Sequence, residues 1–157
     1  MTEENESRVE VVTFEWRTHP DFKKVLIDGS DFSIVFLSWT QENFSPFEIG
    51  SVPLEIADLL QATSQTVLLS PETFQKQQNR HPEISPDYYA VVPVIFEQGE
   101  AYEQEPQTKV QFVWEAGGFG FEATVKRTAK GEIYLVSFFR AKRGRIQKTR
   151  RKYRRVL

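Results

Sequence analysis

The sequence predicts an α+β fold in which helices pack on an antiparallel β-sheet meander, with a β-rich extension at the N-terminal end. Two segments are predicted to be helices: 53–60 has apolar residues at helical spacing, and 70–79 begins with residues typical of a helix start. The region from 100 to 140 instead holds several runs rich in β-branched and aromatic residues, joined by short polar or glycine-bearing links. With 39% hydrophobic residues, the 157-residue chain can fill a packed core.

The first 62 residues are predicted to be largely β-structure. Residues 1–7 are polar and acidic, and we expect them to be disordered. Apolar residues alternate over 8–18, which favours a strand, and the Asp28-Gly pair between 24–27 and 32–39 indicates a hairpin. Residues 46–50 are predicted to form a loop.

Helices and one buried strand are expected next. Leu54, Ala57 and Leu60 have helical spacing, and residues 66–69 are a short apolar run typical of a buried strand. Ser70-Pro-Glu72 is a helix start, and the helix is expected to run to about residue 79. A similar start at Ser85-Pro-Asp87 opens another helix, which Pro93 is expected to break or kink if the helix extends that far.

The rest of the fold is predicted as four antiparallel strands, at 100–103, 109–116, 119–128 and 132–140. In the last strand, simple alternation puts Ile133, Leu135, Ser137 and Phe139 on one face. Ser137 and Arg140 then lie on opposite faces unless a bulge intervenes. The predicted organisation is a disordered start over 1–7, the β-rich extension over 8–62, an α+β domain over 63–141 and a basic tail over 142–157.

Charge is distributed very unevenly along the chain. The net charge is −2, but residues 140–157 contain ten Lys and Arg and no acid. Residues 1–139, with ten cations against 22 carboxylates, therefore carry a net charge of −12. This asymmetry favours a tail that binds a polyanion, and it also fits a tail that docks on the acidic surface of its own chain or on a protein partner.

His81, in Gln78-Asn-Arg-His-Pro-Glu83, is the main candidate for proton transfer. An imidazole can give or take a proton near neutral pH, as cleavage of RNA through its 2′-hydroxyl requires. Alternatively, it only contacts the carbonyl end of a helix. Ser137 either bonds a phosphate oxygen or relieves crowding over the core. The absence of cysteine excludes thiolate metal sites and cysteine nucleophiles, and no carboxylate spacing is typical of a metal site, so no cofactor is expected.

The run His81-Pro-Glu-Ile-Ser-Pro-Asp-Tyr-Tyr-Ala-Val-Val-Pro-Val-Ile95 is similar to a "His-Pro-Glu … Tyr … Ile-Pro … Ile" signature, and the strands at 110–115, 121–126 and 135–140 follow it. Together these segments resemble phage-associated members of the barnase–EndoU–colicin–RelE superfamily of ribonuclease and toxin domains. The resemblance spans roughly residues 66–145. It implies helices packed on a four-stranded antiparallel sheet, and RNA cleavage without a metal. It also implies that His81, Ser137 and Arg140 are catalytic.

These observations lead to a first hypothesis, a metal-independent endoribonuclease-like domain that acts on RNA, with Lys109, Lys126, Arg143 and Arg145 as substrate-binding cations. The second hypothesis is a non-enzymatic module that binds nucleic acid or protein through the basic tail. The third is an interaction protein that binds a partner through its acidic body. The acidic start is unlike a secretory signal and no apolar run reaches about 20 residues, so we expect a cytoplasmic protein that does not enter a membrane.

Overall fold

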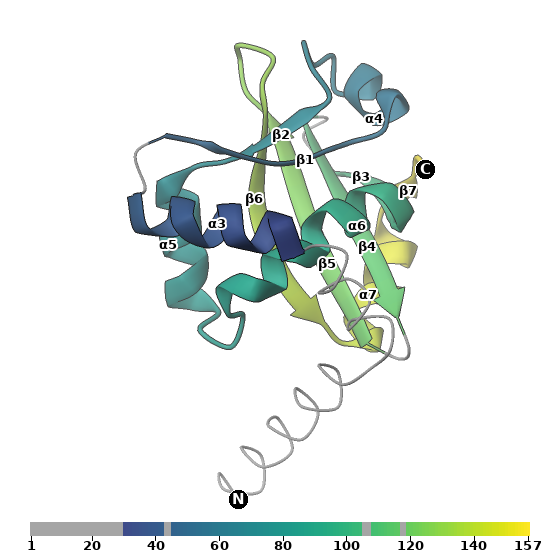
Figure 1. Cartoon of the computed structure of the whole chain (residues 1–157). Helices are drawn as coiled ribbons and strands as arrows, with labels where there is room; N and C mark the ends of the chain where they lie inside the picture. Colours follow the sequence, from purple (N-terminus) through teal and green to yellow (C-terminus); the bar gives the residue numbers. More distant parts are fainter. Residues whose placement is uncertain (1–29, 43–44, 105–107, 117–118) are drawn as a thin grey trace, which may run out of the picture.

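The computed structural model describes residues 30–42, 45–104, 108–116 and 119–157, and over these ranges the fold is α+β (Figure 1). The sheet has seven strands in the order β1-β2-β6-β5-β4-β3-β7. They are β1 (Phe47–Ser51), β2 (Thr66–Leu69), β3 (Glu100–Gln104), β4 (Lys109–Ala116), β5 (Phe119–Arg127), β6 (Ile133–Ala141) and β7 (Arg154–Arg155). All neighbouring strands are antiparallel except β2 and β6, which are parallel.

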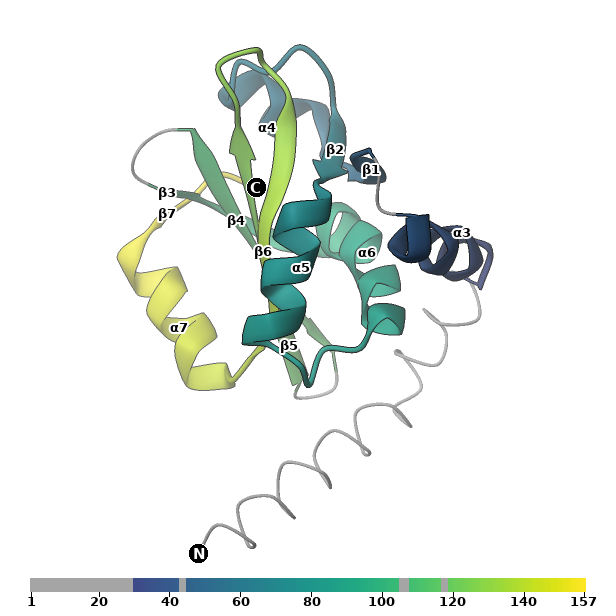
Figure 2. The ribbon, with the colours of Figure 1, turned by 90° about the vertical axis from the view of Figure 1, so that its left-hand side faces the viewer.

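Helices cover both faces of this sheet. They are α3 (Ser30–Glu42), α4 (Leu54–Leu59), α5 (Pro71–Arg80), the 3-10 helix η1 (Pro86–Ala90), α6 (Val91–Gln98) and α7 (Arg143–Lys152). Helices α3, α5 and α6 lie on one side, and α7 lies on the other (Figure 2). The main hydrophobic core fills the space under α3, α5 and α6. No helix in the described ranges is long and apolar enough to cross a bilayer.

The predicted meander is confirmed in β3 to β6, and so are the predicted helix at 53–60, the strand at 66–69 and the helix after Ser70. The Ser70 hydroxyl accepts a hydrogen bond from the Thr73 amide at 3.1 Å, and Pro71 occupies the first turn, so α5 begins where the sequence indicates. Pro93, in contrast, does not break a helix. It lies in the first turn of α6, where a missing N–H costs no intrahelical bond, and α6 continues to Gln98.

Two predictions in the N-terminal region are wrong. Residues 32–39 form part of α3 rather than a strand, because Phe32, Phe36 and Trp39 point inward at helical spacing. Residues 46–50 are not a loop, since most of them form β1, which pairs with β2 and buries Ile49. Thus residues 30–62, expected to be β-rich, hold two helices and one strand. The expectations for 1–7, 8–18 and 24–29 lie outside the described residues.

A β-bulge in β6 corrects the predicted faces of that strand. Thr124 of β5 is opposite Ser137, but the next residue, Val125, is opposite Leu135, so Val136 is the extra residue. As a result Leu135 and Phe138 are buried in the main core, whereas Ser137 and Phe139 lie on the α7 side. The prediction that Ser137 shares a face with Leu135 is therefore wrong.

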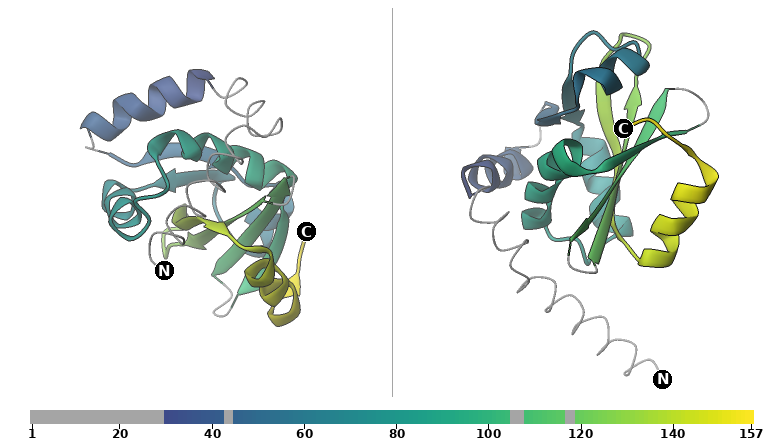
Figure 3. Two further views of the ribbon diagram at one scale, coloured as in Figure 1. Left: turned by 90° about the horizontal axis from the view of Figure 1, so that it is seen from below. Right: turned by 90° about the vertical axis from the view of Figure 1, so that its right-hand side faces the viewer.

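The basic tail forms an ordered part of the fold. Helix α7 packs on the sheet and β7 pairs with β3 (Figure 3). Ile146 of α7 is fully buried and fits over Gly120 of β5, where any Cβ would overlap the Ile146 Cδ1 atom. Three arginines also pair with acids of the sheet: Arg145 with Glu122, Arg150 with Glu100 and Glu115, and Arg154 with Glu103. The tail therefore docks, in part, on its own acidic surface, one of the alternatives left open by its charge.

The Glu100–Arg150 pair predicts a specific dependence of stability on pH. Arg150 donates two hydrogen bonds of 2.9 Å to the Glu100 carboxylate, and these bonds lower the pKa of Glu100 from its ordinary value of 4.5. A lowered folded-state pKa adds stability above about pH 4.5, and this stability is lost as the pH falls through the lowered value.

We expect urea titrations between pH 7 and 3 to show that the free energy of unfolding falls less on acidification for Glu100→Gln than for the native chain. Glu55→Gln, at an exposed position on α4, is the matched control and should keep the native pH profile. If the free energy of unfolding fell equally with decreasing pH for the native chain and for Glu100→Gln, a stabilising role of the pair would be contradicted.

Candidate active site beside helix α7

His81 stands at the end of α5, where the next residue, Pro82, disfavours further helix. Its backbone N–H donates to the Gln77 carbonyl at 2.8 Å and closes the last turn. Its ring stacks on Phe139 of β6, with 5.6 Å between ring centres and 18° between planes. Its Nδ1 lies 3.1 Å from Oε1 of Glu83. With the proton on Nδ1, this contact leaves Nε2 as the proton acceptor.

Three cations line the same hollow as this imidazole. A hollow of about 440 Å³ is lined by His81, Phe139, Arg140, Lys142 and Arg145. The guanidinium carbon of Arg145 lies 4.6 Å from the centre of the Phe139 ring, a cation–π distance. The structure therefore brings together three of the predicted residues, His81, Arg140 and Arg145, although they come from α5, β6 and α7. A site with these charges suits an anion.

Glu122 of β5 holds Arg145 in place. Its carboxylate is fully buried, and it accepts hydrogen bonds of 3.0 Å from Nε of Arg145 and from the Thr149 hydroxyl. A buried carboxylate requires such partners, because it has lost its hydration. Glu122 thus ties α7 to the sheet at two successive turns, at Arg145 and at Thr149, and it fixes the direction of the Arg145 side chain.

A second hollow, of about 270 Å³, lies between α7 and the sheet. Its lining comes from β3 to β6 and from α7 and the residue after it: Gln104, Gln111, Thr124, Ser137, Phe139, Arg145, Lys148, Thr149, Lys152 and Tyr153. Phe139 and Arg145 line both hollows, so the two adjoin. Ser137 belongs to this second hollow and does not line the one around His81.

The remaining predicted cations lie outside both hollows. Lys109 and Lys126 are opposite each other on β4 and β5, two residues from Gln111 and Thr124 along their strands. By alternation they share the α7-facing side of the sheet with that pair. Arg143, the first residue of α7, is exposed.

Sequence reasoning missed several residues of these hollows. Glu83 and Phe139 were not assigned to the site, although Glu83 is two residues from His81 in the sequence, and Lys142 was expected to bind RNA only as part of the basic tail. Apart from Ser137, the polar floor of the second hollow was also missed. Its signal was polar residues inside otherwise apolar strands, such as Gln111 and Thr124.

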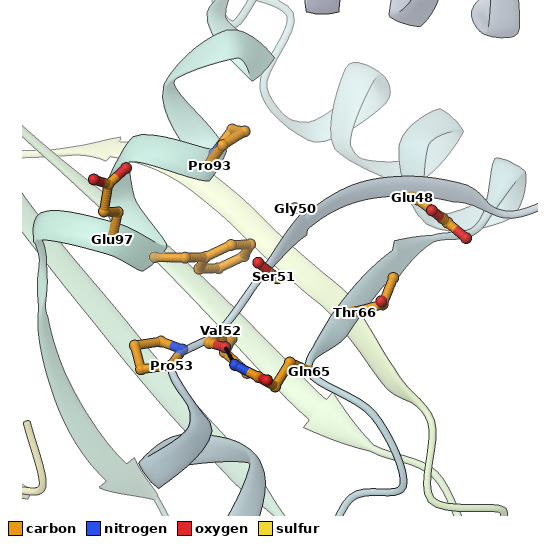
Figure 4. A pocket seen from close by; sticks show the side chains of 10 residues that line it. Glu48, Gly50, Ser51, Val52, Pro53, Gln65, Thr66, Pro93 and Glu97 are labelled. Carbon is orange, nitrogen blue, oxygen red and sulfur yellow. Dashed lines mark hydrogen bonds between the residues drawn. The ribbon is translucent and has the colours of Figure 1, made fainter.

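A third hollow, of about 630 Å³, lies between β1, which is one edge strand of the sheet, and α6 (Figure 4). Among the described residues that line it, Glu48 and Glu97 carry charge and none is a cation, so its charge is unsuited to a phosphate. Gly50 brings β1 close to α6, since a Cβ there would stand 3.2 Å from the Phe96 ring.

The residues that the structure describes contain no group of three or more His, Cys, Asp or Glu side chains that could hold a metal ion. No protein-family model, curated protein or solved structure matches this chain.

Proposed function

We propose that this chain is a metal-independent, endoribonuclease-like domain that cleaves RNA phosphodiesters in the hollow around His81. The observation that carries the proposal is the position of one imidazole, paired through Nδ1 with Glu83, in the same hollow as the side chains of Arg140, Lys142 and Arg145. This set provides a proton acceptor and positive charge at one place, which are the two requirements for cleavage through the neighbouring 2′-hydroxyl.

The proposed step needs only groups of the protein and the RNA. Nε2 of His81 takes the proton of the 2′-hydroxyl, and the 2′-oxygen forms a bond to phosphorus. The bond from phosphorus to the 5′-oxygen breaks, and the leaving oxygen takes a proton from solvent. Arg140 and Arg145 stabilise the extra negative charge of the pentavalent phosphorane. The products are a 2′,3′-cyclic phosphate and a 5′-hydroxyl end.

Cations along α7 support binding of the rest of the RNA strand. Lys148, Arg151 and Lys152 are exposed, and no carboxylate of the described residues lies within ion-pair distance of them. Their charge is therefore available to phosphates, unlike that of Arg150 and Arg154. The same feature favours a second candidate function, RNA binding without cleavage.

The test is a gel assay of end-labelled, single-stranded RNA with the full chain in EDTA. We expect cleavage to persist in EDTA and the 5′ fragments to end in a 2′,3′-cyclic phosphate. RNA binding without products at any protein excess would support the second candidate, and the absence of both binding and cleavage would contradict both.

The triple variant Lys148→Ala, Arg151→Ala, Lys152→Ala is expected to weaken RNA binding. A plot of log affinity against log salt concentration has a negative slope, and loss of three phosphate contacts should make it less steep by about 2, since each contact contributes about 0.7 for single strands. Filter binding between about 50 and 200 mM salt measures this slope. An unchanged slope would show that α7 does not contact the phosphates. Glu55→Gln, far from α7 on α4, is the control.

A further inference from the structure

We propose that the hollow beside Ser137 binds the base of one nucleotide, and that it thereby selects the nucleotide beside the cleaved phosphate. The inference rests on the proposed function, because the adjoining hollow around His81 would hold that phosphate. It assigns Ser137 to recognition of the base rather than to chemistry at the phosphate.

A row of uncharged polar side chains forms the floor of this hollow. Gln111 is opposite Thr124 and Thr124 is opposite Ser137, so the three lie side by side across β4, β5 and β6. Gln104 of β3 extends the row, since its amide donates to Oε1 of Gln111. Gln111 is only 4% exposed and Thr124 only 7%. Buried positions in a sheet are usually apolar, because a polar group there loses its hydration.

Within the described part of the chain, the hydroxyls of Thr124 and Ser137 have no hydrogen-bond partner. Both side chains line the hollow. Each hydroxyl can donate one hydrogen bond and accept two. A ligand with donors and acceptors along one flat edge would pair with these groups, whereas an apolar ligand would leave them unpaired.

The size and charge of the hollow indicate which kind of ligand fits it. Its volume of about 270 Å³ is below the roughly 300–1,000 Å³ of sites for drug-sized molecules, so it has room for one heterocycle. Lys148 and Lys152 line its α7 side, which favours a ligand attached to a negatively charged group. Tyr153 adds an aromatic ring, the usual surface on which unpaired bases stack.

The position of the hollow links it to the cleavage site. Phe139 and Arg145 line both this hollow and the one around His81. A base bound over Ser137 therefore lies next to the hollow that would hold its phosphate. Together, the polar floor, the cationic wall and this adjacency favour a nucleotide over other anions.

The test measures binding of the four nucleoside 3′-monophosphates of RNA by isothermal titration calorimetry. We expect the native chain to prefer at least one base by about tenfold, which corresponds to about 1.4 kcal/mol, because hydrogen bonds to one base edge discriminate against the other bases. Thr124→Val and Ser137→Ala should each reduce the preference severalfold. Thr66→Val makes the same change as Thr124→Val in the hollow of Figure 4 and should leave the preference unchanged.

NMR titration of the native chain provides a readout that does not depend on variants. The amide signals of Thr124 and Ser137 should shift with the preferred nucleotide, while those of Gly50 and Thr66 should not. Equal affinity for all four bases, or no shift at Thr124 and Ser137, would overturn the inference. Cleavage without base preference would overturn the base site alone, and base-selective binding without cleavage would overturn the nuclease proposal alone.

Discussion

Replacing His81 with alanine is expected to lower the rate of RNA cleavage by about 100- to 10,000-fold, the usual range for loss of a general acid or base. Among the described side chains that line its hollow, His81 is the one whose type ordinarily exchanges a proton near neutral pH, and the other polar members are one lysine and two arginines. Single-turnover cleavage at saturating RNA measures the chemical step without the contribution of binding.

His81→Phe is the matched control for packing, because a phenyl ring can keep the stack on Phe139 but cannot transfer a proton. It should lose activity as completely as the alanine variant. Both variants should bind RNA as the native chain does, and His81→Phe should keep nearly the native melting temperature because it keeps the stack on Phe139. A phenylalanine variant that cleaves at the native rate would remove His81 from the mechanism.

Replacing Phe36 with alanine is expected to lower the free energy of unfolding by about 3–5 kcal/mol, the usual cost of removing a buried phenyl ring. Phe36 is fully buried, and its ring lies 5.0 Å from that of Tyr89 and 5.2 Å from that of Phe47, between ring centres. Truncation therefore leaves a cavity where α3 meets η1 and β1. Urea unfolding followed by tryptophan fluorescence and circular dichroism measures the change.

Ile34→Ala is the control on the same helix. Ile34 is 68% exposed, so its truncation should change the free energy of unfolding by less than about 0.5 kcal/mol. Similar losses for Phe36→Ala and Ile34→Ala would contradict the inward orientation of Phe36.

Local sequence signals predicted those parts of the fold whose structure is determined by residues close together in the sequence. The Ser70-Pro71 start fixed α5, and short links between β-rich runs indicated the meander. The same reasoning failed at α3, because Ile34 and Val35 favour a strand by propensity but lie on the exposed side of a helix. Contacts of Phe36 with residues distant in the sequence decide the structure of this segment.

The site was less predictable than the fold, since its grouping depends on tertiary contacts. The sequence indicated His81, Arg140 and Arg145, but not that Phe139 would contact both His81 and Arg145. It left open whether a bulge occurs, and the bulge at Val136 is what turns Ser137 toward α7. The sequence analysis left open whether the basic tail docks on the chain itself and predicted no helix in it, because the partner that holds α7, Glu122, lies more than 20 residues earlier.

The parallel pairing of β2 with β6 has a consequence for the kinetics of folding. Val67 is opposite Ile133, a contact that closes a loop of almost half the chain. The pairings of β3 with β4, β4 with β5 and β5 with β6, in contrast, join strands that are consecutive in the sequence. Loop closure of this length costs entropy before any contact compensates for it, so it slows folding. Until β6 has been synthesised, one edge of β2 has no strand to pair with, and a nascent chain arrested before β6 would expose that edge to aggregation.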